Sequence, residues 1–151
     1  MSQIPFTKEG YNKLSAEKNS LEKERVDAVS ALKQARELGD LSENAAYKVA
    51  RSKLSSIDSR LRYLNRTLNN SYVVDNVFKG VVDIGCYVTV ENESSKQTYQ
   101  IVSSHESDIL NGKISFYSPI GKALMGKKVG DSVSAQTPLG LRNYTVKDIK
   151  I

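Results

Sequence analysis

Apolar residues in the first half of the chain recur at a spacing that constrains the fold more than any other feature. After Asp40 they follow one another at alternating intervals of three and four residues. That spacing places them on one side of an α-helix and is typical of a helix that packs lengthwise against another. Most of the stability of such a helix comes from covering its apolar side. The residues are Tyr47, Ala50, Leu54, Ile57, Leu61, Leu64 and Leu68.

The partner precedes this helix, because the same spacing occurs before Gly39. Two of its positions hold Lys18 and Arg25, whose aliphatic stems can lie along the partner while their charges reach water. Thr7 is a suitable N-cap for the first helix, Gly39 suits a positive φ at its end, and Asp40 is expected to cap the second helix. So short a break predicts an antiparallel hairpin about 45 Å long. The first stripe consists of Tyr11, Leu14, Lys18, Leu21, Arg25, Ala28, Leu32 and Ala35.

The second half has a different composition. Residues 1–75 contain no proline after Pro5 and one glycine beyond the first ten residues, whereas residues 76–151 contain seven glycines and two prolines. This shift predicts a domain boundary near residue 75, linked through the polar segment Asn69–Ser71. Short β-branched and aromatic runs and one short helix at Ile120–Lys127 predict an α+β domain with an antiparallel sheet. The expected strands are Val81–Val82, Cys86–Val90, Gln97–Val102, Lys113–Tyr117, Ser132–Ala135 and Tyr144–Ile149.

Composition excludes several kinds of chemistry. A single cysteine and a single histidine exclude a disulfide framework, a multi-cysteine metal site and a pair of catalytic histidines. No segment approaches the ~18 consecutive apolar residues of a membrane span, and the N-terminus does not resemble a signal peptide. We therefore expect a cytoplasmic protein with no membrane partner. The net charge of +5 suits an acidic partner such as a nucleic acid, although many other proteins carry a similar excess.

Basic residues are concentrated on the second predicted helix. Residues 44–70 contain six lysines and arginines, and Asp58 is their only acidic residue. One interpretation is a solvated face that forms ion pairs with the acidic residues of the first helix. The other is a row of charges that binds phosphates. The sequence leaves both open.

Asp40 and Glu43 stand three residues apart at the predicted turn, so both carboxylates can lie at one end of the second helix. A structural interpretation is available, because this pair is a variant of the capping box and acids stabilise a helix N-terminus. The functional interpretation uses the same geometry, since two ionised carboxylates on an exposed end can bind a hard cation such as Mg²⁺. Mg²⁺ takes about six oxygen ligands, so the pair would be part of a site completed by another protein.

Four segments in the same order resemble a known family. They are IPFTKEGYNKL at the start, RELGDLSENAAY at residues 36–47, HESD at residues 105–108 and ISFYSPIGKALMGKKVGD at residues 114–131. These segments are distributed over nearly the whole chain. In them the sequence resembles the bacterial Gre transcript-cleavage factors, a family of transcription elongation factors. Leu41 makes the turn segment GreA-like.

The resemblance implies a fold and a mode of action. It implies an α-helical coiled-coil hairpin over residues 1–75 and an FKBP-like globular domain over residues 76–151, in a monomeric protein. Gre factors dock on the β′ rim of bacterial RNA polymerase and insert the hairpin tip into its secondary channel. There they stimulate the polymerase's own Mg²⁺-dependent cleavage of a backtracked RNA 3′ end. The factor is then not itself an enzyme.

The family's functional residues map onto this sequence one by one. The acidic pair falls on Asp40 and Glu43, which would hold Mg²⁺ jointly with the polymerase and act in catalysis, while Ser42 and Asn44 would support the tip. Basic residues near the turn would contact the nascent RNA. These are Lys33, Arg36, Lys48, Arg51 and Lys53. The candidates for polymerase docking are Glu106, Asp108, Ser118, Pro119 and Ile120.

Two departures from the family pattern leave alternatives open. Ala46 replaces a residue that is usually acidic, and Val26 stands where a proline is common, which would straighten the first helix. The loss of an acid near the tip keeps open a regulator that occupies the channel and inhibits. A third hypothesis is a coiled-coil adaptor with a peptide-binding or isomerase domain and no polymerase partner.

Overall fold

The computed structural model describes residues 3–40 and 44–151. The chain forms two compact units. The sheet unit comprises Met1–Gly10 and Ser71–Ile151, and the hairpin unit comprises Tyr11–Asn70, so the chain crosses between them after residue 10 and after residue 70. Sequence analysis placed the first ten residues with the hairpin, whereas in the structure they group with the sheet.

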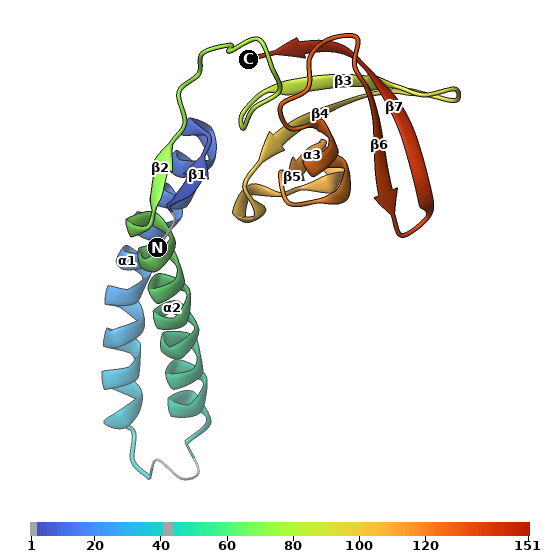
Figure 1. Cartoon of the computed structure of the whole chain (residues 1–151). Helices are drawn as coiled ribbons and strands as arrows, with labels where there is room; N and C mark the ends of the chain where they lie inside the picture. Colours follow the sequence, from blue (N-terminus) through green and yellow to red (C-terminus); the bar gives the residue numbers. More distant parts are fainter. Residues whose placement is uncertain (1–2, 41–43) are drawn as a thin grey trace. The chain divides into compact units, whose positions relative to one another are not determined.

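Two long helices build the hairpin unit. Helix α1 (Lys8–Arg36) and helix α2 (Ala45–Asn69) run antiparallel (Figure 1). Five residues of the predicted stripes pack together in one cluster, namely Leu21, Ala28, Leu54, Ile57 and Leu61, and Leu64 is fully buried, whereas Arg25 of the first stripe is exposed. Helix α1 continues without a break through Val26. The helical hairpin predicted from the spacing is therefore confirmed.

Ion pairs between the helices flank this narrow core. Arg25 Nε lies 2.6 Å from Asp58 Oδ1, and Arg60 Nε lies 2.6 Å from Glu17 Oε1. The hydrogen bonds from the arginines lower the pKa of both the Asp58 and the Glu17 carboxyl below their usual values. The structural interpretation of the basic helix therefore holds for Arg60, which pairs with an acid of α1, whereas Arg25 belongs to α1 and pairs with Asp58 of α2.

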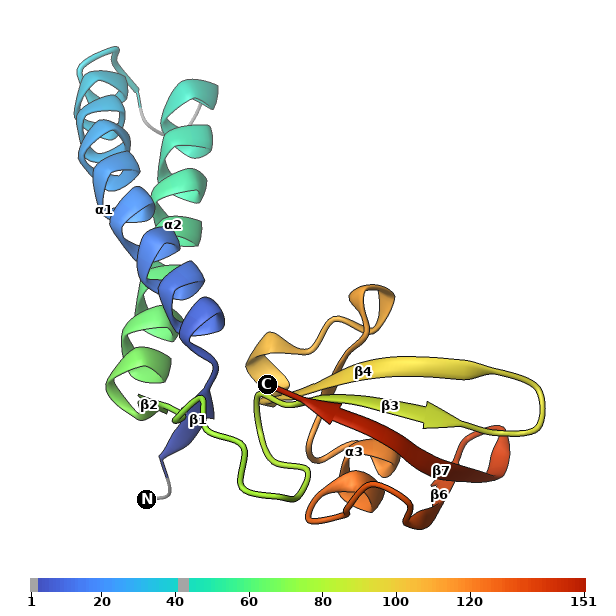
Figure 2. The same ribbon diagram turned by 90° about the horizontal axis from the view of Figure 1, so that it is seen from above.

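A curled sheet forms the larger part of the sheet unit (Figure 2). Its strand order is β5-β4-β3-β7-β6, and all neighbours pair antiparallel except β4 and β5, which run parallel. The predicted two-part fold is confirmed, with this one parallel pair as a difference in detail. Helix α3 packs against β6, and the core of the sheet unit includes Val88, Val146 and Leu124. The elements are β3 (Tyr87–Glu91), β4 (Lys96–Val102), β5 (Lys113–Ser115), α3 (Pro119–Leu124), β6 (Ser132–Thr137) and β7 (Gly140–Lys150).

A second, two-stranded sheet joins the start of the chain to the segment after α2. Strand β1 (Ile4–Phe6) pairs parallel with β2 (Ser71–Val73), and two 3-10 turns, η1 (Ser104–Glu106) and η2 (Ile109–Asn111), follow β4. None of these elements was expected from the sequence. No helix within residues 3–40 and 44–151 combines the length and the apolar character of a membrane span.

Candidate functional site

Asn44 connects the two helices at the hairpin turn. Its Oδ1 accepts a hydrogen bond from the Tyr47 amide at 3.0 Å, and its Nδ2 donates to the Ala35 carbonyl at 2.7 Å. One side chain thus caps the start of α2 and holds the end of α1. The prediction that Asp40 caps the second helix is wrong, because α2 begins only at Ala45 and its N-cap is Asn44. An amide can donate and accept at once, whereas an ionised carboxylate can only accept.

Asp40 lies in the exposed turn directly after Gly39, whose φ of 122° is open to glycine and strained for other residues. The prediction of a positive φ at Gly39 is confirmed. Ser42 and Glu43 lie outside the described residues, so the expected pairing of Asp40 with Glu43 stays a prediction. Within residues 3–40 and 44–151 no three acidic, histidine or cysteine side chains are grouped so that they could hold a metal ion. Asp40 nonetheless offers the exposed, hard oxygen donor that Mg²⁺ prefers.

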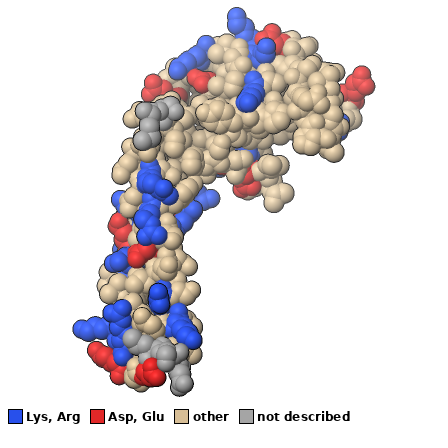
Figure 3. Space-filling model, turned by 60° about the horizontal axis from the view of Figure 1, so that its bottom comes forward, with Lys and Arg blue, Asp and Glu red and all other residues tan. Residues whose placement is uncertain are grey.

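Five basic side chains lie near the hairpin turn, at the end of α1 and the start of α2. All five are exposed, and none forms an ion pair with an acidic residue that the structure describes. Arg36 instead lies over the Tyr47 ring, 5.8 Å from its centroid. Lys and Arg side chains gather on this part of the hairpin unit (Figure 3). We call them the tip cations: Lys33, Arg36, Lys48, Arg51 and Lys53.

In the sheet unit, three of the predicted docking residues lie together at the start of α3. Ser118 Oγ accepts from the Gly121 amide at 3.0 Å and donates to the Ser115 carbonyl at 2.6 Å, so Ser118 is the N-cap of α3. With Pro119 and Ile120 it borders a mostly apolar hollow of about 250 Å³, which we call the α3 hollow. Ile109 and Tyr99 are also part of its lining.

The other two docking candidates are not part of the lining of the α3 hollow, although Asp108 stands between two lining residues, Ser107 and Ile109. The Asp108 carboxylate accepts a hydrogen bond from Asn111 Nδ2 at 2.6 Å, in an exposed loop. The Glu106 carboxylate is half-buried and bonded to Thr7, near the N-terminus of the chain. The structure thus brings Ser118, Pro119 and Ile120 to one surface and places Glu106 and Asp108 outside its lining.

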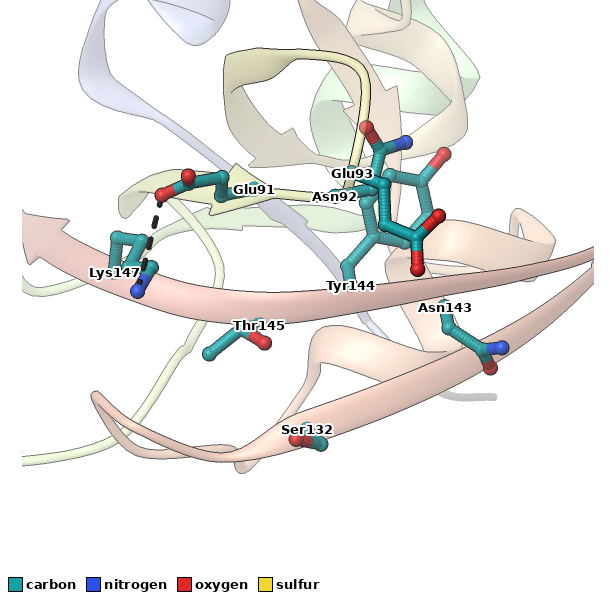
Figure 4. A pocket seen from close by; sticks show the side chains of 8 residues that line it. All are labelled: Glu91, Asn92, Glu93, Ser132, Asn143, Tyr144, Thr145 and Lys147. Carbon is teal, nitrogen blue, oxygen red and sulfur yellow. Dashed lines mark ion pairs between the residues drawn. The ribbon is translucent and has the colours of Figure 1, made fainter.

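Sequence analysis missed two features of the sheet unit. Tyr99 borders the α3 hollow, and burial, with Tyr144 nearby, raises the pKa of its hydroxyl. A second hollow of about 380 Å³ lies over β7 and β6, where Lys147 pairs with Glu91 at 3.8 Å (Figure 4). The remaining lining side chains of this hollow are hydroxyls, amides and Glu93, and no sequence motif connects them.

Comparison with known proteins gives the family. The model of the transcription elongation factor N-terminal domain matches residues 4–73, and that of the GreA/GreB C-terminal domain matches residues 77–151. The chain belongs to the GreA/GreB family of transcription elongation factors. It is 45% identical to the transcription elongation factor GreA of Neorickettsia sennetsu over 155 residues, covering 99% of this chain and 98% of that protein. The identity to GreA of Thermosipho africanus is 42% over 151 residues, covering 98% and 97%.

Among solved structures, the GreA factor homolog Gfh1 of Thermus thermophilus is 28% identical, with coverage of 99% of both chains and a TM-score of 0.47. The GreA/GreB match over both halves of the chain confirms the resemblance predicted from the four segments. Family membership alone does not assign a role to Asp40, to the tip cations or to the α3 hollow.

Proposed function

We propose that this GreA/GreB-family chain stimulates RNA polymerase to cleave its own transcript when the RNA 3′ end has backtracked out of the active centre. The observation that carries the proposal is the exposed carboxylate of Asp40 at the turn of a long two-helix hairpin, with the tip cations directly behind it. In this role the hairpin enters the secondary channel, and the chain contributes side chains to an active site that belongs to the polymerase.

At the turn, Asp40 and Glu43 present two carboxylates to the polymerase active centre. Mg²⁺ held there supplies the charge stabilisation and water activation of two-metal phosphodiester hydrolysis. Two carboxylates are too few to hold Mg²⁺ tightly alone, so the polymerase provides the remaining ligands. Asn44 keeps the turn in place by its bonds to Tyr47 and Ala35. Ser42, which lies outside the described residues, has a supporting role at the tip in this proposal.

The tip cations bind the extruded RNA. Because they are exposed and lack ion pairs with described acids, their charges are available to phosphates without first breaking an ion pair with a described acid. Arg36 lies over the Tyr47 ring, a cation–π contact that favours this position of its guanidinium. Farther from the turn, Arg25 and Arg60 are engaged with Asp58 and Glu17 and belong to the frame of the hairpin.

The sheet unit docks on the β′ rim of the polymerase. The α3 hollow is the surface best suited to this contact, since Pro119 and Ile120 offer apolar area beside the capped start of α3. Exposed Ile109 extends that area on the same hollow. Asp108 supplies a carboxylate from the neighbouring loop.

The direct test is RNA cleavage in a stalled, backtracked elongation complex of a bacterial polymerase with Mg²⁺. Wild type should release short 3′ fragments, and Asp40→Asn/Glu43→Gln should lose this release while still binding the polymerase. Glu93→Gln, which removes an exposed carboxylate of the sheet unit, is the matched control and should cleave as wild type does. Equal cleavage by wild type and the tip variant would refute the role of the acidic pair.

One observation favours a second candidate function. Ala46 leaves the first turn of α2 without an acidic residue. A factor with too little negative charge at its tip would occupy the channel without recruiting Mg²⁺ and would inhibit the polymerase. In the same assay, wild type that binds the polymerase but releases no fragment would establish this function. Ala46→Glu would then be expected to restore cleavage.

A further inference from the structure

The carboxylate of Glu106 lies at the start of α1, within the sheet unit. Its Oε2 accepts from the Thr7 amide at 3.0 Å, and its Oε1 accepts a close hydrogen bond from the Thr7 hydroxyl. The same hydroxyl accepts from the Gly10 amide at 3.0 Å. Thr7 is therefore the N-cap of α1, as predicted, and Glu106 fixes this cap from η1, 99 residues away in the sequence. We call Thr7, Gly10 and Glu106 the α1 latch.

The α1 latch explains why residue 10 is a glycine. It lies inside α1, and its φ is not among the positive values that require glycine in this chain. A glycine in a helix is less stable than alanine. A Cβ at residue 10 would, however, lie 2.7 Å from Glu106 Cγ and closer still to the carboxylate. Glycine is thus needed here to admit the Glu106 side chain.

A neighbouring contact fixes the same segment. Phe6 is fully buried and its ring lies 5.8 Å from that of His105, the residue before Glu106. The Phe6 carbonyl also accepts from the Val74 amide at 2.9 Å, which extends the pairing of β1 with β2. The start of the chain is therefore held by η1 through Phe6 and Thr7 and by β2 through the backbone.

This arrangement matters because the chain leaves the sheet unit after Gly10 without leaving α1. We propose that Glu106 is a positioning residue: by fixing the first turn of α1 in the sheet unit, it restricts the motion of the hairpin unit, which continues the same helix. A helix transmits such a restraint because its backbone hydrogen bonds continue across the crossing point. The second crossing, after Asn70, lies between α2 and β2 and offers no continuous element.

A double-mutant cycle tests the latch itself. In the wild-type background, Gly10→Ala should lower Tm, because the new Cβ displaces the carboxylate from Thr7. In the Glu106→Ala background the space is empty, so Gly10→Ala should raise Tm by about 1–4 °C through the higher helix propensity of alanine. Thr7→Ser, which keeps the hydroxyl, should retain the contact. The same sign for Gly10→Ala in both backgrounds would overturn the latch.

The positioning role is tested by the spread of distances between the units in the free protein. Spin labels on Ser52→Cys and Glu93→Cys report on the hairpin unit and the sheet unit, and both sites are exposed whereas the native Cys86 is buried. Glu106→Ala and Gly10→Ala should broaden the distance distribution, and Thr7→Ser should not. Unchanged widths in the first two variants would overturn the proposal. No polymerase is present, so this result is independent of the cleavage function proposed above.

Discussion

The dependence of the hairpin turn on Asn44 can be tested with two substitutions. Asn44→Ala removes both of its hydrogen bonds, the cap on the Tyr47 amide and the bond to the Ala35 carbonyl. Asn44→Asp keeps an acceptor for the Tyr47 amide but loses the donor to Ala35. The two variants therefore separate the capping of α2 from the tie between the helices.

The expected magnitudes follow from these two contacts. Loss of an N-cap costs about 0.5–2 kcal/mol, and loss of a hydrogen bond of the Ala35 type costs about 0.5–1.5 kcal/mol. Asn44→Ala should therefore lower the free energy of unfolding of the hairpin by about 1–3.5 kcal/mol. Asn44→Asp should lower the free energy of unfolding by about 0.5–1.5 kcal/mol through the lost bond to Ala35. A few tenths of a kcal/mol should be regained, because a carboxylate stabilises a helix N-terminus.

Urea unfolding followed by far-ultraviolet circular dichroism is the appropriate assay, because α1 and α2 are the two long helices of the chain. The order of stability should be wild type, then Asn44→Asp, then Asn44→Ala. If the alanine and aspartate variants are equally stable, the capping bond contributes nothing. If both match wild type, Asn44 does not hold the turn.

Three further predictions concern the hairpin. Leu64→Ala should lower the free energy of unfolding by about 2–5 kcal/mol because Leu64 is fully buried, whereas Val49→Ala, at an exposed position, should change it by less than about 0.5 kcal/mol; urea unfolding compares them. Glu17 and Asp58 have lowered pKa values in the folded state, so their contribution to folding stability is present above about pH 4 and is lost on acidification below it. A pH titration of helicity should show this loss of stability. The loss should be smaller in Glu17→Gln/Asp58→Asn. Lys48→Gln and Arg51→Gln should each make the plot of log cleavage rate against log salt less steep, by about 0.7–0.9 if each side chain binds one phosphate. Lys23→Gln is the control and should leave the slope unchanged. Slopes that stay the same in the first two variants would contradict the RNA contact.

The sequence predicted the parts of the fold that depend on local spacing. Alternation of three and four residues determines one side of a helix, so Ala28, Ile57 and Leu64 could be assigned to the contact before their burial was known. The cap of α2 was assigned wrongly because Asp40 and Asn44 both suit that position. What decides between them is the carbonyl of Ala35, which only an amide can satisfy together with the Tyr47 amide.

Contacts between distant segments could not be predicted in this way. Nothing in the segment around Glu106 indicates Thr7 as its partner, because no periodicity relates residues 99 positions apart. The sequence did carry a signal, since Gly10 interrupts the helix propensity of α1 without a turn to explain it. A glycine in a helix with ordinary φ indicates that another part of the chain approaches closely, although it does not identify that part.

The ion pair of Arg60 supports the structural interpretation of the basic face of α2, while phosphate binding by Lys48 and Arg51 stays a prediction. Arg60 and Asp58 of α2 form ion pairs with α1, so neutralising them should change stability and leave the salt dependence of cleavage unaltered. Lys48 and Arg51, nearer the turn, have no ion pair with an acid in the described part of the chain. Neutralising them should therefore change the salt dependence of cleavage and leave stability unaltered. Exposed ion pairs contribute little to stability, about 0–1 kcal/mol each. The two groups of residues are therefore distinguished by which quantity a substitution changes, the stability or the salt dependence of cleavage. A residue whose substitution changed both quantities would not belong to either group.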